Sequence, residues 1–171
     1  MSSSRLVDAT NAAVGQAIGD GIANTPEGLS VRQLIPGLDL LDKNGNEITD
    51  YSWVQTHTVD NQDELIYNGI RDGDSKVVAI SSVMALGSAS LYTTSIRFDK
   101  GSAVAQLIDI QGLEVSNRIE ATAIVLNPVL VFKKGQDAKI YFRGKTGATG
   151  KTDQILLNGA VAEPRGTYVN E

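Results

Sequence analysis

The chain has 171 residues, a formal net charge of −5 at pH 7, no cysteine and one histidine, His57. The absence of cysteine excludes disulfides and thiolate metal sites, and a lone histidine excludes a multi-histidine metal site within one chain. The length favours one domain, and the hydrophobic fraction of 42% is typical of a soluble fold.

The net charge is unevenly distributed along the chain. Residues 1–74 carry 4 basic and 12 acidic side chains, which gives −8, and residues 75–171 carry 11 basic and 8 acidic, which gives +3. Neither half is basic enough to indicate a nucleic-acid partner.

Residues 1–29 differ in composition from the rest of the chain and form a candidate N-terminal arm. Ser, Ala, Gly, Asn and Thr dominate this segment. Each of Gly15, Gly19 and Gly21 costs a helix about 1 kcal/mol relative to Ala, so an isolated helix would be marginal. Two alternatives stay open: an arm that orders on a partner, or a short helix that packs on its own domain. In the first, the contacts would come from four apolar residues at loosely helical spacing: Leu6, Val14, Ile18 and Ile22.

The next segment predicts short strands separated by turns. Ile35-Pro36-Gly37 indicates a turn, and Leu38–Leu41 a strand. Asn44-Gly45 favours the type I′ turn of a hairpin, with Glu47–Val54 as the returning strand. Tyr51 and Trp53 lie on one face of that strand, and the alternation favours Trp53 as a core residue.

An uncharged run from Val77 to Ile96 is long enough to raise the possibility of a membrane helix. Its Ser and Thr content and Gly87 favour two buried strands around a turn instead, so we expect no membrane partner. The predicted strands are 76–84 and 90–98, and Asp99-Lys100-Gly101 then turns into a strand over 103–110.

The stretch from Ile119 to Phe142 holds three apolar β-type runs separated by two turn signals. Asn127-Pro128 should end or bend the first strand, because Pro removes a ladder donor. Residues 132–138 predict a hairpin, with Gly135 at a positive φ. Short strands are also expected at 65–67, 113–115 and 154–158. About ten strands with little helix predict an all-β fold: an antiparallel sandwich or a jelly-roll-like barrel over residues 30–171, preceded by an extended or partly helical arm.

The glycine-rich segment Gly144–Thr152 is close to a phosphate-binding P-loop but does not match it. The motif needs a glycine five residues before Gly150, and Lys145 stands there. Asp42, Asn44 and Asn46 have the spacing that begins a calcium-binding EF-hand loop, but Glu47 replaces the required glycine. His57 has no accompanying nucleophile motif. We therefore expect no catalytic, cofactor or metal site, and no enzyme.

Six basic residues lie within nineteen positions, opposed there only by Asp137: Lys133, Lys134, Lys139, Arg143, Lys145 and Lys151. Ordinary solvated surface is one interpretation, because exposed ion pairs contribute only about 0–1 kcal/mol each. The other is that this stretch faces an acidic surface, either residues 1–74 of a neighbouring copy or a shell protein, where complementary charges steer association.

The combination of a polar arm (1–29), a cysteine-free β body with Asp-Lys-Asn-Gly-Asn and Lys-Lys-Gly-Gln-Asp turns, and the tail Tyr168–Glu171 resembles the small β-rich decoration, or cement, proteins of tailed-phage and related viral capsids. The resemblance is one of overall character. It implies a structural virion protein on the outer capsid surface, a homotrimer that bridges subunits of the major capsid protein. The alternative is a ligand-binding β-sandwich for a carbohydrate or a receptor, for which the chain has few aromatic residues.

Overall fold

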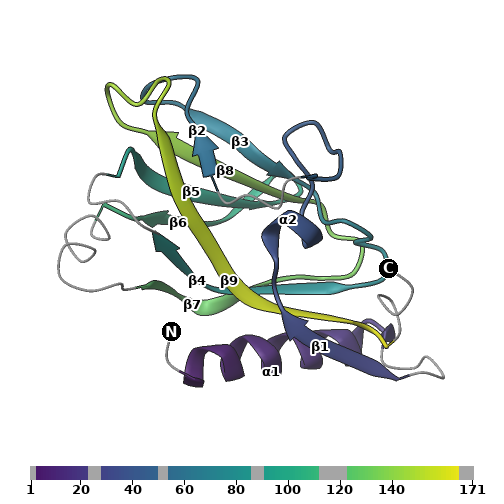
Figure 1. Cartoon of the computed structure of the whole chain (residues 1–171). Helices are drawn as coiled ribbons and strands as arrows, with labels where there is room; N and C mark the ends of the chain where they lie inside the picture. Colours follow the sequence, from purple (N-terminus) through teal and green to yellow (C-terminus); the bar gives the residue numbers. More distant parts are fainter. Residues whose placement is uncertain (1–2, 23–27, 50–53, 86–90, 112–122, 166–171) are drawn as a thin grey trace.

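The computed structural model describes residues 3–22, 28–49, 54–85, 91–111 and 123–165. In these residues two antiparallel β-sheets pack face to face, and one long helix lies on the outside (Figure 1). Strands far outweigh helix among these residues, which confirms the predicted all-β class. The fold is the sandwich of the two predicted alternatives, because the described strands close no barrel.

The first sheet, called sheet 1, has five strands, and β9 is at its centre. The order is β1-β9-β4-β7, and β2 also pairs with β9. The bounds are β1 Leu29–Gln33, β2 Val54–Thr56, β4 Val77–Ala85, β7 Ala123–Phe132 and β9 Thr152–Pro164.

The second sheet, called sheet 2, has four strands in the order β3-β8-β5-β6. The bounds are β3 Asp63–Asn68, β5 Thr93–Lys100, β6 Ala103–Asp109 and β8 Ala138–Gly144. Two helices complete the fold, α1 Ser3–Gly19 and the single-turn α2 Pro36–Asp39.

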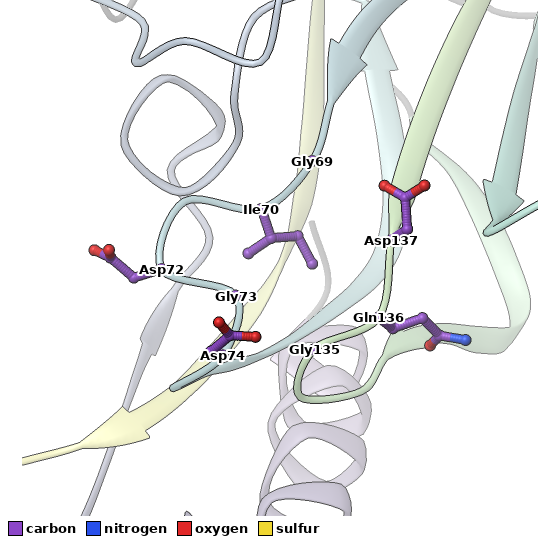
Figure 2. Close-up of a pocket in the computed structure, with 8 residues that line it drawn as sticks. All are labelled: Gly69, Ile70, Asp72, Gly73, Asp74, Gly135, Gln136 and Asp137. Carbon is purple, nitrogen blue, oxygen red and sulfur yellow. The ribbon is translucent and has the colours of Figure 1, made fainter.

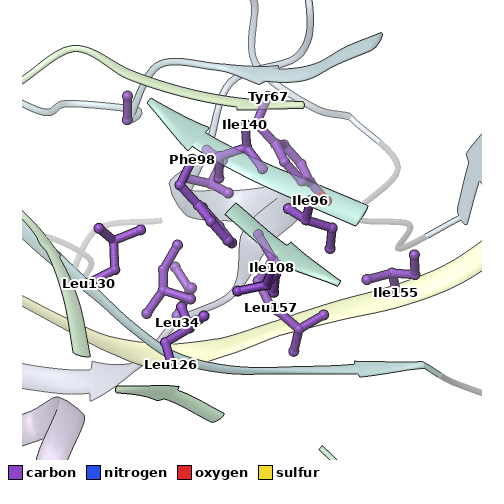
Figure 3. Close-up of a cluster of buried hydrophobic side chains, with 14 of the residues drawn as sticks. Leu34, Tyr67, Ile96, Phe98, Ile108, Leu126, Leu130, Ile140, Ile155 and Leu157 are labelled. Carbon is purple, nitrogen blue, oxygen red and sulfur yellow. The ribbon is translucent and has the colours of Figure 1, made fainter. Parts of the chain in front are cut away.

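The main core lies between the two sheets (Figure 3). Strand residues of alternating position point into it, as the two-residue period of a strand requires. Its largest fully buried apolar side chains are Phe98, Phe132, Phe142, Leu40, Ile80, Ile96, Ile110, Leu126, Ile140 and Ile155.

A second apolar cluster lies between α1 and the outer face of sheet 1. Ala9, Ala13 and Ala17 recur every four residues, so they share one helix face, and all three are fully buried. They meet small residues of β4 and β9, among them Ala79 and Ala160, which allow the helix to lie close to the sheet. The arm is therefore helical and packs on its own chain.

Burial on both faces explains why β4 is apolar along almost its whole length. Val78 and Ile80 belong to the core between the sheets, whereas Val77 and Ala79 contact the α1 cluster. The uncharged run noted in the sequence is thus partly a central strand. No helix in the described part of the chain has the length and hydropathy that a bilayer crossing requires.

Several predicted turns are confirmed. Gly101 and Gly135 take φ values of 62° and 73°, and the turn at Gly101 joins β5 to β6 in a true hairpin. The strand bends at Asn127-Pro128 without ending: β7 continues through it, and its pairing with β4 shifts register there.

Four predictions at the level of elements need correction. The described part of the predicted returning strand Glu47–Val54 shows only an isolated bridge from Glu47 to Leu41, and Val54 begins β2, which pairs with β9. Residues 132–138 do not form a hairpin, because β7 belongs to sheet 1 and β8 to sheet 2, so the turn crosses between the sheets. The predicted strand Leu38–Leu41 begins inside α2, which starts at Pro36 and whose Asp39 carboxylate accepts a hydrogen bond from the Ile35 amide. The predicted short strand 154–158 is part of the 13-residue β9. The predicted strand 113–115, Tyr51 and Trp53 lie outside the described residues.

Candidate functional site

The four predicted contact residues of the arm have different environments. Ile22 is buried in the cluster between α1 and sheet 1, so it stabilises the chain itself. Val14 is half-buried, whereas Ile18 is 61% exposed. Leu6 lies in α1, and its side chain is outside what the structure describes. Val7, which the prediction left out, is 53% exposed. It precedes Ile18 by eleven residues, about three helical turns, so the two share one outward stripe.

The six predicted basic residues do not form one patch. Lys133 and Lys134 are exposed in the turn before β8, whereas Lys145 and Lys151 lie beyond its other end. The seven residues of β8 separate the two groups by roughly 20 Å at about 3.3 Å per residue.

Local acidic partners accompany two of these basic residues along β8. The Lys139 ammonium lies 3.8 Å from the Asp137 carboxylate, and the Arg143 guanidinium lies 3.6 Å from that of Asp63. Lys133 and Lys134 have no ion pair among the described residues, and Lys133 faces another cation. Burial, together with the like charge of Lys133, lowers the pKa of Lys100. The β7–β8 turn thus holds two ammonium groups without a described ion pair, and the Asp20 carboxylate accepts a hydrogen bond from the Lys134 amide in the same turn.

The outer face of sheet 2 carries a charged array that sequence reasoning missed. Arg97 binds the carboxylates of Asp63, at 2.7 Å, and Asp99, at 3.0 Å, and its guanidinium lies 4.2 Å from the centre of the Tyr141 ring. The strand registers place Leu65, Tyr141, Arg97 and Leu107 in one row across the four strands. Leu107 ends that row on β6 and is 63% exposed. The row depends on pairing between distant strands, which no local pattern predicts.

His57 lies in a buried polar cluster at one end of the sandwich. Its Nε2 is 2.8 Å from the Thr93 hydroxyl and 3.5 Å from the Asp153 carboxylate, and its Nδ1 is 3.4 Å from that of Glu64. The bond with Asp153 raises the pKa of His57, and burial opposes that rise only in part. Burial alone would raise the pKa of Asp153, but hydrogen bonds from His57, the amides of Tyr92 and Thr93 and the Thr93 hydroxyl lower it. A hydroxyl, an imidazole and a carboxylate thus lie together, but His57, Thr93 and Asp153 are all inaccessible to a substrate.

The glycine-rich loop between β8 and β9 is held by the segment that follows β2. The Asp60 carboxylate accepts hydrogen bonds from the amides of Gly147 and Thr149 and from the Thr149 hydroxyl, and these bonds lower the pKa of Asp60. The backbone of His57 bonds to Lys151 and to Gly150. Amides that would cradle a phosphate in a P-loop therefore bind a carboxylate of the chain itself.

A buried ionic group connects β1, α2 and β9 with Lys76, the residue before β4. Arg32 binds both carboxylate oxygens of Asp39 and also Glu163, and the Lys76 ammonium lies 3.3 Å from Asp39. Burial acts to lower the pKa of Arg32, but the two carboxylates raise it overall. The group holds two positive and two negative charges, so it compensates itself and is a structural element.

One cavity opens just after the C-terminal end of β7, and another opens at the bend in the middle of this strand. The first, of about 410 Å³, is lined by Asp72, Asp74 and Asp137, and the side chains of Asp72 and Asp137 point in different directions (Figure 2). No group of three or more His, Cys, Asp or Glu among the described residues is arranged to hold a metal ion. The second, of about 500 Å³, lies between Asp8 of α1 and the bend of β7 at Pro128.

The spacing of Asp42, Asn44 and Asn46 is explained by a turn. The Asp42 carboxylate accepts hydrogen bonds from the amides of Asn44 and Asn46 within that turn.

No protein-family model, curated protein or solved structure matches this chain. The features that a partner could contact are therefore read from the surface alone. Exposed large apolar side chains of the described residues occur on α1 (Val7, Ile18), on β6 (Val104, Leu107), and singly at Ile35, Val54 and Val125.

Proposed function

We propose that this chain is a structural protein that assembles through its surface, a capsid decoration protein that forms homotrimers and bridges neighbouring subunits of a viral shell. The observation that carries the proposal is the pair of exposed apolar side chains on the outward stripe of α1, Val7 and Ile18. Single exposed apolar residues are ordinary, but two on one helix face favour a partner over water.

The character of α1 supports this role. Asp8 is its one described charged side chain. Most of the outer surface of α1 would therefore cause no charge repulsion against a neighbouring molecule. Its inner face is packed on sheet 1, so the stripe is presented on a fixed support rather than on a free arm. A contact built on a fixed helix avoids the ordering cost that a disordered arm would pay on binding.

The carbohydrate-binding alternative would use an exposed aromatic ring as a platform. In the described residues, the Arg97 guanidinium lies over the Tyr141 ring, and the Lys145 ammonium is 5.3 Å from the centre of the Tyr92 ring. A sugar would have to displace these cations to stack on the faces they cover, and this disfavours a glycan site on either ring.

The test replaces Ile18 by Asp and measures mass in solution and co-sedimentation with empty shells. We expect the unchanged chain to show about three times its own mass of 18.2 kDa and to bind shells. Ile18→Asp should weaken association at least about tenfold, since burying an unpaired charge at an interface is costly. At a dilution where both proteins are monomeric, their melting temperatures should be equal, because Ile18 is exposed in the single chain.

Val54→Asp is the matched control, because it makes the same apolar-to-charged change at an exposed side chain of β2, outside α1. It should leave the trimer intact. A chain that stays monomeric and binds no shell would overturn the proposal, and selective binding on a glycan array would favour the alternative.

A further inference from the structure

Among the described strands, β6 forms one edge of sheet 2 and lies beside β5 at one side of the sandwich (Figure 1). No described strand pairs with its other side. An edge strand presents unpaired backbone amides and carbonyls, and proteins that avoid edge pairing protect such strands with Pro, Lys or other charges. The seven residues of β6 include neither Pro nor Lys, and one charged residue, Asp109.

Two other described edges, those formed by β7 and β3, are better protected. At the edge of sheet 1, β7 contains Pro128, which has no amide to donate. At the opposite edge of sheet 2, β3 begins with the acidic residues Asp63 and Glu64. Among these three, β6 is the strand best suited to accept another strand.

The side chains of β6 add an apolar contact to this edge. Val104 and Leu107 are 60% and 63% exposed. They are three residues apart, a spacing that would place them on opposite faces of a regular strand. The pairing with β5 shifts register between them, so Val104 lies opposite Asp99 and Leu107 opposite Arg97. Both therefore lie on the outer face of sheet 2, where a strand added to the edge would cover them.

We propose that β6 is an interface between two copies of this chain, in which the two β6 strands pair antiparallel about a two-fold axis at Leu107. Sheet 2 would then run continuously through both copies. In this register Leu107 faces Leu107, and Gln106 faces Ile108. The one acidic residue, Asp109, comes opposite the register shift at Ala105 and not opposite its own copy, so the pairing brings no like charges directly opposite each other.

We assign a second copy of this chain to the β6 edge because two β6 strands fit each other in this register. The axis falls in the stretch from Gln106 to Asp109 that pairs regularly with β5, so the backbone there has the extended geometry that a further strand needs. This contact is distinct from the trimer contact proposed for α1. A two-fold contact through β6 would join neighbouring trimers. This contact does not depend on whether the chain binds a viral shell.

The absence of cysteine makes the register directly testable. Directly opposed residues of antiparallel strands have Cα atoms about 4.5–5.5 Å apart, within the range that a disulfide bridges. We expect Leu107→Cys to form a covalent dimer under mild oxidation. Ala103→Cys, on the same strand but four residues from the axis, should not, and neither should Val54→Cys on β2.

A non-covalent measurement completes the test. Leu107→Lys places two like charges at the axis, so it should weaken dimerisation at least tenfold in a dilution series by sedimentation, whereas Val54→Lys should not. Failure of Leu107→Cys to cross-link in the folded protein, or equal cross-linking of Ala103→Cys, would overturn the proposal. Loss of shell binding with intact Leu107→Cys cross-linking would count against the proposed function alone.

Discussion

At the scale of single residues, His57 is the most consequential. Its imidazole faces two carboxylates, Asp153 from β9 and Glu64 from β3, and the hydroxyl of Thr93 from β5. Its backbone holds both Gly150 and Lys151. One residue thus connects both sheets to the glycine-rich loop, and its protonation should influence the stability of that end of the sandwich.

We predict that the protein loses stability as pH rises above about 6.5, the ordinary pKa of histidine. The pKa of His57 is raised in the folded state, so the folded protein binds the proton more tightly than the unfolded chain does. The stability that His57 contributes is fully present below its pKa in the unfolded chain. It is lost as pH rises through its higher pKa in the folded protein. Chemical denaturation at a series of pH values measures it.

His57→Gln is the matching variant, because it keeps a hydrogen-bonding side chain but does not titrate in this range. Its stability should be lower at acidic pH, by about 1–3 kcal/mol for the weakened polar cluster, and should lack the decline above 6.5. An equal decline in both proteins would assign the pH dependence to other groups.

At the scale of elements, the question is what holds α1. Its alanine face is buried against β4 and β9, yet Gly15 and Gly19 lower its helix propensity. Packing therefore compensates for a weak intrinsic preference, as it does in most short helices of globular proteins. The two alternatives for the arm, a helix on its own domain or one that orders on a partner, differ in a measurable way.

We predict that Gly15→Ala stabilises the isolated chain by about 0.5–1 kcal/mol. A Cβ at Gly15 meets nothing within 4 Å, so the substitution gains helix propensity without a clash. The melting temperature should rise even at concentrations where the chain is monomeric. If it rises only in the assembled state, α1 forms on a partner and not on sheet 1.

The same substitution at Gly159 is the contrasting control, because there the Cβ would lie 1.8 Å from the Ala79 carbonyl oxygen of the neighbouring strand. Gly159→Ala should destabilise the protein strongly. The two glycines differ in function: one is tolerated on a helix surface, and the other is required where β4 and β9 approach closely.

At the scale of the whole molecule, the charges are arranged differently from their order in the sequence. The basic stretch 133–151 is divided between the two ends of β8, and acidic side chains accompany it on sheet 2. In the β7–β8 turn, the ammonium groups of Lys133 and Lys134 have no described ion pair, whereas the nearby Lys100 ammonium lies 5.8 Å from the centre of the Phe132 ring. This turn is the part most able to contact an acidic surface of another molecule.

We predict that Lys133→Glu with Lys134→Glu weakens association at low salt and has less effect at high salt, because screening reduces such attraction beyond about 10 Å at 0.1 M. Arg143→Glu with Lys151→Glu makes the same charge change at the other end of β8 and should have a smaller effect. Sedimentation at two salt concentrations compares them. Identical behaviour of the two double variants would show that net charge, not this turn, governs association.

The amino-acid sequence by itself determined the fold class, the positions of the turns at Gly101 and Gly135 and the buried character of β4. These features depend on local φ preferences and on runs of apolar residues, which neighbouring positions specify.

Only the tertiary structure decided which sheet each strand joins. The turn at Gly135 has the same local chemistry whether it returns to the same sheet or crosses to the other, so the 132–138 segment was misassigned as a hairpin. Likewise Arg32 and Glu163 are 131 residues apart in the chain, and His57 reaches Asp153 only because β2 pairs with β9. Such contacts follow from strand pairing, a property of the whole chain.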